Sequence, residues 1–259
     1  MNKRRIYLLG ITFVCLLLSA NFAFSQAEEG HPIRVLFVGN SFTYYYNLPQ
    51  VVSAMAKTQG LEIITRQSTV GGSNLEEHWK EQKGTRTRRL LDSLEWDYVV
   101  LNNHSRSTID TPDEFSEYGK KFVDLIRSKG AEPVFMQTWG YKSNPLMIRT
   151  IIPKYAELSA QTGSYLVPGG ELFMEARKWR PDLEMFQDDK HPSPNGTYML
   201  GLAFYKFFTG RSTEAIPPRL TTLDQDGEKT YLMFMTPEDA DFLQQLVDDF
   251  EFNTLKSGE

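Results

Sequence analysis

The chain has 259 residues, a formal net charge of −5 at pH 7 and a single cysteine. This length suits one well-buried domain and is short for two. The acidic balance, with no basic stripe along the chain, argues against nucleic acid as a partner.

The N-terminus has the pattern of a secretory signal peptide. Lys3-Arg4-Arg5 precede a long apolar run, and Ala23-Phe24-Ser25 offer the small residues that a signal peptidase needs. We therefore predict that residues 1–25 are removed and that 26–259 form a single domain, secreted or periplasmic in a bacterium, with no stable membrane insertion. The competing interpretation is a membrane anchor. The only cysteine lies in the leader, so the mature chain is expected to have no disulfide and no thiol nucleophile.

Strand-like and helix-like segments alternate along the rest of the chain. The predicted strands are 33–38, 61–70, 97–101, 133–138 and 164–167. The predicted helices are 49–59, 76–94, 111–130, 145–161, 171–178, 193–208 and one that starts at Thr236, with a capping box at Thr111-Pro-Asp-Glu114. Five strands alternating with helices favour an α/β fold whose parallel sheet is covered on both faces. Residues 210–229 fit no element.

Polar residues follow several of these strands, at the edge where open α/β sheets bind ligands. The segments are Gly39-Asn40-Ser41, Gly71-Gly72-Ser73-Asn74, Asn102-Asn103-His104-Ser105 and, later in the chain, Asp188-Asp189-Lys190-His191. They supply a serine, glycine amides, carboxamides, and an aspartate three residues before a histidine. Acyl transfer to serine requires these groups. The hydroxyl needs a base to remove its proton, the base needs a carboxylate to orient it, and the oxyanion needs hydrogen-bond donors that are already in place.

These segments resemble the sequence blocks of the SGNH (GDSL-like) hydrolases. GNSFT follows the first strand, a glycine follows the second, and an asparagine amide follows the third, while DDKHPS precedes the last helices. This is the order of the family's blocks, Ser, Gly, Asn and His. The similarity spans about Ile33 to Phe208, and HPSPNGTY resembles a secreted bacterial branch tied to carbohydrate de-esterification. The resemblance implies a flavodoxin-like three-layer α/β/α sandwich with a five-stranded, mainly parallel sheet, and no metal or organic cofactor.

For the catalytic groups, the resemblance implies Ser41 as the nucleophile, His191 as the general base and Asp188 as the carboxylate that orients the base. Asp189 is the alternative for the orienting role. The first block has Asn40 at a position where many members have aspartate. The residue at this position does not pair with the base, His191. Taken alone, Ser41 is also compatible with a plain helix N-cap.

The oxyanion hole implied by the resemblance uses the Ser41 amide, the Gly72 amide and a carboxamide at Asn102 or Asn103. Gly71 is the alternative for Gly72. The third block of the family usually reads Gly-x-Asn-Asp, whereas this strand runs into Leu-Asn-Asn-His without that glycine. The choice between the two asparagines therefore stays open, with a slight preference for Asn102.

Further residues near these loops have two interpretations each. His104 is a possible substrate contact, and Trp139 could stack on a sugar ring or simply pack. His78 is expected to be a surface residue or a substrate contact, and the tyrosines of Tyr44-Tyr45-Tyr46 suit packing or substrate equally. A zinc site at the histidines is disfavoured, because the chain has no His-x-x-x-His pair and the mature chain no cysteine.

The sequence thus predicts a secreted serine esterase that hydrolyses acetyl esters on a carbohydrate, with an acylated carbohydrate or other small ester as its partner. One alternative is a non-catalytic carbohydrate-binding protein on the same scaffold. Another is an esterase or thioesterase of small lipid acyl esters. A flavodoxin-like phosphate binder at residues 39–41 is less favoured, because that turn lacks the glycines and lysine of a P-loop.

Overall fold

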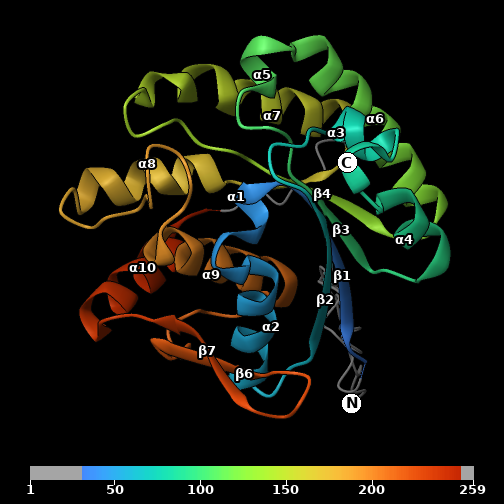
Figure 1. Cartoon of the computed structure of the whole chain (residues 1–259). Coiled ribbons are helices and arrows are strands. Elements are labelled where there is room, and N and C mark those ends of the chain that lie inside the picture. The colour runs from blue at the N-terminus through green and yellow to red at the C-terminus, as the bar shows by residue number, and fades with distance from the viewer. Residues whose placement is uncertain (1–30, 252–259) are drawn as a thin grey trace, which may run out of the picture.

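A computed structural model describes residues 31–251 of the chain. Its centre is a five-stranded sheet in the order β2-β1-β3-β4-β5, in which all neighbouring strands are parallel (Figure 1). The strands are β1 (Ile33–Gly39), β2 (Ile63–Thr69), β3 (Tyr98–Leu101), β4 (Glu132–Met136) and β5 (Tyr165–Val167). The predicted five-stranded parallel sheet is confirmed, and the carboxyl ends of β2, β1 and β3 lie side by side.

Helices cover both faces of the sheet, with α2, α9 and α10 on one side and α4, α6 and α7 on the other (Figure 1). The α-helices are α1 (Ser41–Tyr44), α2 (Leu48–Thr58), α3 (Leu75–Trp79), α4 (Thr87–Ser93), α5 (Ser107–Asp110), α6 (Pro112–Ser128), α7 (Ile148–Thr162), α8 (Gly169–Trp179), α9 (Pro194–Thr209) and α10 (Pro237–Asp249). Three short 3-10 helices are η1 (Tyr45–Asn47), η2 (Gln82–Gly84) and η3 (Pro145–Met147).

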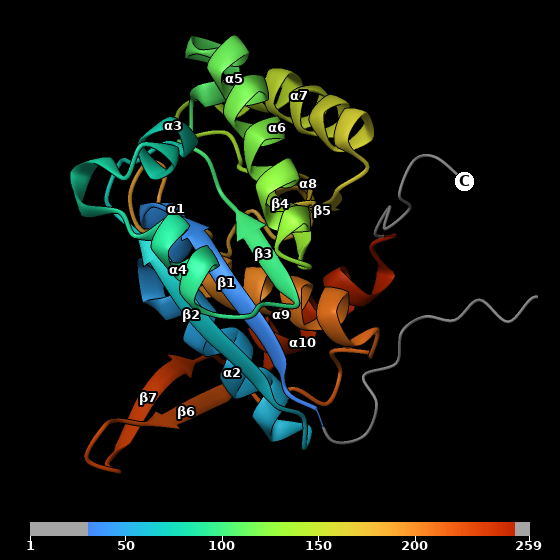
Figure 2. The same cartoon turned by 90° about the vertical axis from the view of Figure 1, so that its right-hand side faces the viewer.

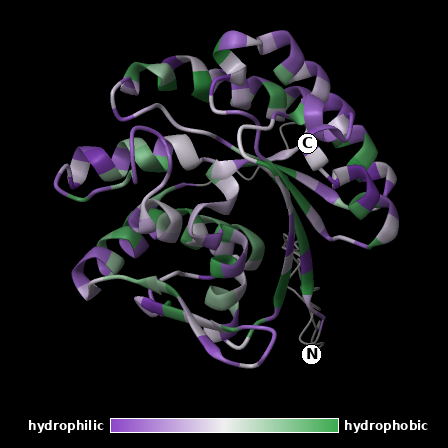
Figure 3. Cartoon of the chain, in the orientation of Figure 1, coloured by the Kyte–Doolittle hydropathy of each residue, from purple (hydrophilic) through white to green (hydrophobic). Residues whose placement is uncertain are grey.

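The central strand β1 is buried on both faces. Val35 and Phe37 belong to the hydrophobic cluster with α2 and α9, whereas Leu36 and Val38 belong to the cluster with α6 and α7. Burial of each such side chain contributes roughly 1.5–3 kcal/mol, so the unbroken apolar run of β1 stabilises both layers at once. Figure 3 shows hydrophobic stretches along the central strands and hydrophilic residues recurring along the outer helices.

Two predicted helical features are wrong in detail. The expected helix over 76–94 is divided into α3, η2 and α4, because Glu81 and Lys83 adopt positive φ angles of 51° and 53° that no α-helix continues. The expected capping box at Thr111 does not form, since its side chain caps nothing. The short helix α5 instead runs directly into α6, and the Thr111 amide bonds the Ser107 carbonyl.

The second half of the unassigned segment 210–229 forms, together with the residues after it, an antiparallel hairpin of β6 (Arg219–Leu223) with β7 (Lys229–Phe234). Its turn is held by Asp224, whose carboxylate accepts from the Asp226 and Glu228 amides. The hairpin packs against α2 and extends away from the sheet (Figure 2).

The predicted signal peptide, residues 1–25, lies outside the described residues. Within the described range of 31–251, no helix combines the length and apolar character needed to cross a bilayer.

Candidate active site

Ser41 stands at a tight strand-to-helix turn that the preceding residues impose. A Cβ on Gly39 would lie 2.5 Å from Thr43 Oγ1 and 2.9 Å from Asn102 Cβ, so only glycine fits there. Asn40 then caps α1, because its Oδ1 accepts from the Phe42 amide at 3.0 Å. The first residue of α1 is Ser41, which remains partly exposed.

The Asn40 side chain also joins the three loops at the sheet edge. Its Nδ2 donates to the carbonyl oxygens of Ser73, at 3.0 Å, and Asn103, at 3.1 Å. An aspartate could not make these two donations, because an ionised carboxylate only accepts. Asn40 is thus a positioning residue, a role that the sequence analysis did not assign to it.

The structure brings Ser41, His191 and Asp188 together. His191 Nε2 lies 2.8 Å from Ser41 Oγ, and His191 Nδ1 lies 2.7 Å from Asp188 Oδ2. Ser41 and His191 are 150 positions apart in the sequence, so this contact depends on the fold. With Nδ1–H donating to the carboxylate, Nε2 is left as the acceptor for the serine proton.

Asp188 is held as a carboxylate by its own loop. Burial alone would raise its pKa, but hydrogen bonds from the His191 amide, the His191 ring and the Lys190 amide outweigh it and lower the pKa of Asp188 to about 2. The neighbouring Asp189 faces elsewhere, because its carboxylate accepts from the Ser143 amide at 2.8 Å and the Ser143 hydroxyl at 2.9 Å. Asp188 rather than Asp189 therefore contacts the His191 ring.

Aromatic rings fix the plane of the His191 imidazole. Tyr45 stacks on it with ring centroids 4.1 Å apart and planes 4° apart, and Phe42 meets it edge-on at 5.8 Å. Burial first, and then the Asp188 charge, raise the pKa of Tyr45, so its phenol stays neutral. Of the two interpretations of the tyrosine run, packing applies to Tyr45.

The loop after β2 contains two glycines and lies against Asn40, the residue before Ser41, through the bond from Asn40 Nδ2 to the Ser73 carbonyl. Residues Val70 to Ser73 form a turn in which the Ser73 amide bonds the Val70 carbonyl at 3.1 Å. Gly72 has φ +67°, which the third position of a type II turn requires and glycine supplies. Among the described residues, the amides of Ser41, Gly71 and Gly72 donate to no backbone carbonyl, so each is available to an oxyanion.

The two asparagines after β3 differ in their hydrogen bonding. Asn103 Oδ1 accepts from the Leu75 amide, the His104 amide and the Ser107 hydroxyl at 2.8–3.1 Å. Asn102 Oδ1 accepts from Thr43 Oγ1 at 3.2 Å, whereas Asn102 Nδ2 is a buried donor with no partner in the described part of the chain. Asn103 Oδ1 therefore anchors the loop, whereas Asn102 Nδ2 is closed off from solvent and hence from a substrate in this structure, so the choice of oxyanion donor between the two carboxamides stays open.

His78 is buried, which corrects the expectation of a surface residue or substrate contact. Its Nε2 lies 2.9 Å from the Gly39 carbonyl, which only accepts, so Nε2 carries the proton. The other ring nitrogen, Nδ1, lies 2.7 Å from the Thr87 hydroxyl, and Ser73 Oγ also lies 2.9 Å from Nε2. Burial lowers the pKa of His78 to about 4, so the ring is neutral at pH 7.

Trp139 offers no face to a sugar, which corrects the stacking interpretation. Its side chain is 1% exposed and lies between the rings of Phe42, at 4.5 Å, and Phe173, at 4.2 Å, with both pairs stacked. Its Nε1 donates to the Lys190 carbonyl at 2.8 Å. The residue thus packs against Phe42, which follows Ser41, and supports the loop that carries His191.

His104 is half-buried in the loop after β3. None of the described hydrogen bonds joins its ring to Ser41, Asp188 or His191. The Arg106 amide donates to its Nδ1 at 3.4 Å. Burial first, and then the nearby Lys190 charge, lower the pKa of His104. A substrate contact of His104 stays a prediction.

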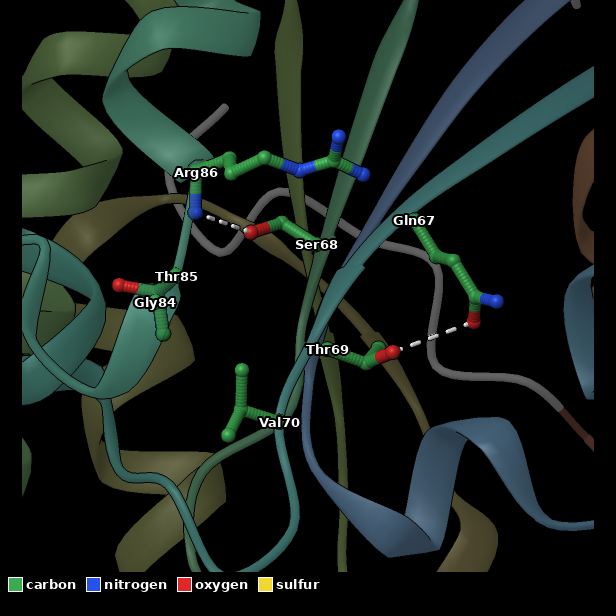
Figure 4. Close-up of a pocket in the computed structure, with 7 residues that line it drawn as sticks. All are labelled: Gln67, Ser68, Thr69, Val70, Gly84, Thr85 and Arg86. Atoms are coloured by element: carbon green, nitrogen blue, oxygen red, sulfur yellow. Dashed lines mark hydrogen bonds between the residues drawn. The ribbon is translucent and has the colours of Figure 1, made fainter.

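A small hollow of about 150 Å³ lies at the end of β2, between Gln67 and Arg86, and does not include the triad (Figure 4). Its polar groups are largely paired, because the Arg86 amide donates to Ser68 Oγ at 3.0 Å and Thr69 Oγ1 donates to Gln67 Oε1 at 3.3 Å. Residues 31–251 contain no group of three or more His, Cys, Asp or Glu side chains placed to hold a metal ion.

The sequence matches no family model and no curated protein sequence. The structure is similar to that of a candidate SGNH hydrolase from Slackia heliotrinireducens, with a TM-score of 0.61 and 24% identity over 69% of this chain and 100% of that one. It is also similar to a DUF4886 family protein from Bacteroides uniformis, with a TM-score of 0.65 and 18% identity over 84% and 93%. An acetyl xylan esterase matches with a TM-score of 0.59 and 14% identity over 68% and 99%. The predicted SGNH hydrolase fold is therefore confirmed.

Proposed function

We propose that this protein is a secreted serine esterase that removes acetyl groups from a carbohydrate through an acyl-enzyme. The observation that carries the proposal is the unbroken hydrogen-bonded path from Asp188 Oδ2 through the His191 ring to Ser41 Oγ, with distances of 2.7 Å and 2.8 Å. A protein that only binds its ligand has no need of a base aligned on a serine hydroxyl.

In the first half-reaction, His191 Nε2 takes the Ser41 proton while Oγ attacks the ester carbonyl carbon. Asp188 stabilises the imidazolium that forms. The oxyanion accepts hydrogen bonds from the Ser41 and Gly72 amides and from the carboxamide of Asn102 or Asn103. The tetrahedral intermediate then collapses, and His191 gives the proton to the departing sugar oxygen, which leaves as a hydroxyl.

In the second half-reaction, water replaces the sugar. His191 removes a proton from water as the water oxygen attacks the acyl carbon. The same amides bind the second oxyanion. Collapse releases acetate, and Ser41 Oγ recovers its proton from His191. No step requires a group beyond the substrate, water and these side chains.

The acetyl and carbohydrate parts of the proposal have two supports. One solved structure with the same fold is an acetyl xylan esterase, and the HPSPNGTY segment resembles carbohydrate-esterase members of the family. Secretion is proposed from the leader-like residues 1–25 alone. Long-chain and thioester substrates are the competing classes for the same triad.

The test is hydrolysis of 4-nitrophenyl acetate by residues 26–259, compared with Ser41→Ala and His191→Ala. We expect turnover in the wild type and a loss on the order of 10⁴-fold or more in each variant, because these groups act as one unit. Circular dichroism of both variants checks that they fold. Equal rates in Ser41→Ala and wild type would refute the proposal, and preference for 4-nitrophenyl palmitate or an acyl thioester would reassign the substrate.

A further inference from the structure

An open groove of about 480 Å³ begins at the segment that carries the triad histidine and runs to the hairpin. We call it the Phe234 groove. Its lining includes Glu184, Gln187 and Asn195 from the segment around His191, and Phe234, Thr236 and Asp239 from β7 and the start of α10. Gln187 precedes Asp188 in sequence, and its amide donates to the His191 carbonyl at 2.9 Å. One wall of the groove is therefore continuous with the catalytic loop.

The groove is also connected to the nucleophile from the other side. The Tyr46 hydroxyl, five residues after Ser41, donates to Gln187 Oε1. Tyr46 and Asn47 have φ angles of 49° and 54°, a conformation that costs non-glycine residues of order 1–3 kcal/mol and is found chiefly where the surrounding structure fixes it. The strand β7 packs against η1, which contains both residues. The hairpin, η1 and the catalytic loop thus meet at the groove.

The lining combines an open aromatic ring with fixed polar groups. Phe234 is 65% exposed, and the Arg219 guanidinium lies 4.1 Å from its ring centroid. Glu184 is paired with Lys142 at 2.6 Å and Asp239 with Arg180 at 3.2 Å, so both carboxylates are held in place and partly neutralised. The volume lies within the range of small-ligand sites.

This chemistry selects among ligand classes. An aromatic ring beside carboxylate and carboxamide groups suits a sugar, whose apolar C–H face packs on the ring while its hydroxyls form hydrogen bonds. A long acyl chain would leave the polar half of the lining without partners. The described lining residues include no lysine or arginine, so the lining itself offers an anionic chain no cation to bind.

We propose that the Phe234 groove binds the part of a neutral oligosaccharide next to the acetylated sugar and so directs the ester to Ser41. This inference rests on the proposed function. The hairpin, whose first strand lies in the segment that the sequence analysis left unassigned, then supplies the aromatic ring of the substrate site.

The test compares Phe234→Ala with Tyr231→Ala, whose side chain is similarly exposed, at 64%, on the same strand but does not line the groove. Each variant is assayed on acetylated xylo-, gluco- and manno-oligosaccharides and on 4-nitrophenyl acetate. We expect Phe234→Ala to lower the ratio of kcat/KM for an oligosaccharide over 4-nitrophenyl acetate at least tenfold, mainly through KM. We expect Tyr231→Ala to keep the wild-type ratio.

A binding experiment separates this inference from the proposed function. Ser41→Ala is titrated calorimetrically with the same oligosaccharides without acetyl groups, alone and combined with Phe234→Ala. Binding that the second substitution weakens supports the groove whether or not the wild type is an esterase. Two outcomes would overturn the groove proposal. One is equal kcat/KM ratios for Phe234→Ala and Tyr231→Ala together with equal binding by Ser41→Ala and the double variant, and the other is no binding of any of the three sugars. Absence of 4-nitrophenyl acetate hydrolysis in the wild type would instead count against the proposed function.

Discussion

The regions around His191 and His78 contain the same side chain in opposite settings. Each ring contacts a Ser or Thr hydroxyl, and both rings lie near the carboxyl end of β1. The His191 ring lies at Ser41, and the His78 ring lies at the Gly39 carbonyl. His191 has a carboxylate on Nδ1, so its Nε2 is free to accept a proton. His78 has a carbonyl on Nε2 and no carboxylate partner, so its proton is fixed on the wrong nitrogen for a base. The partners, and not the residue type, decide which histidine can do chemistry.

Of the changes that test this comparison, we expect Asp188→Asn to have the largest effect on activity. The new Nδ2 would face His191 Nδ1 as a donor, forcing Nδ1 to accept and Nε2 to carry the proton, as in His78. We expect kcat for 4-nitrophenyl acetate to fall on the order of 10³–10⁴-fold. Asp189→Asn is the matched control, because that carboxylate binds Ser143 and not His191. Equal losses in both variants would contradict the assignment of Asp188.

A smaller effect should distinguish the two asparagines. Asn102→Ala removes the carboxamide that the sequence favours slightly for the oxyanion hole, so we expect kcat to fall on the order of 10²-fold. It also leaves the buried Thr43 hydroxyl without its acceptor, so we expect the free energy of unfolding to fall by about 1 kcal/mol. Asn103→Ala leaves three donors without their acceptor, so we expect the free energy of unfolding to fall by about 1–3 kcal/mol. Steady-state kinetics and urea unfolding of both variants measure the contrast, and the reverse pattern would assign the oxyanion donor to Asn103.

A further contrast between the two histidines concerns stability and pH at His78. Its folded-state pKa of about 4 lies below the ordinary value of 6.5, so the unfolded chain binds more protons between these values. The stability that neutral His78 contributes is present above pH 6.5 and is lost as the pH falls toward 4, about 3 kcal/mol in total. Urea unfolding at pH 7.5 and 4.5 should show that difference in the wild type and a smaller one in His78→Gln. Parallel behaviour of the two proteins would show that His78 is not held neutral.

The sequence predicted the sheet and the residues at its edge because both depend on local patterns. Unbroken apolar runs mark strands such as Ile33–Gly39, and a parallel sheet brings their carboxyl ends together. The Asp-x-x-His spacing is likewise local, since Asp188 and His191 bond within one loop.

Tertiary contacts decide what the sequence did not predict. His78 follows two glutamates on a short helix, and only the contact of that helix with β1 and Thr87 buries it. The hairpin of β6 and β7 has mixed polar strands, whose pairing depends on α2 and η1 as the packing surface. The burial of Trp139 between Phe42 and Phe173 requires three segments that are distant in sequence.

Covalent labelling of the protein with a fluorophosphonate tests the central claim most directly. A serine that His191 activates should attack phosphorus, with the oxygen–phosphorus bond forming as fluoride leaves. We predict a single adduct, located on Ser41 by peptide mass spectrometry, that is absent in Ser41→Ala and strongly slowed in Asp188→Asn. An adduct on a different residue, or hydrolysis of 4-nitrophenyl acetate by a protein whose Ser41 stays unlabelled, would contradict the account.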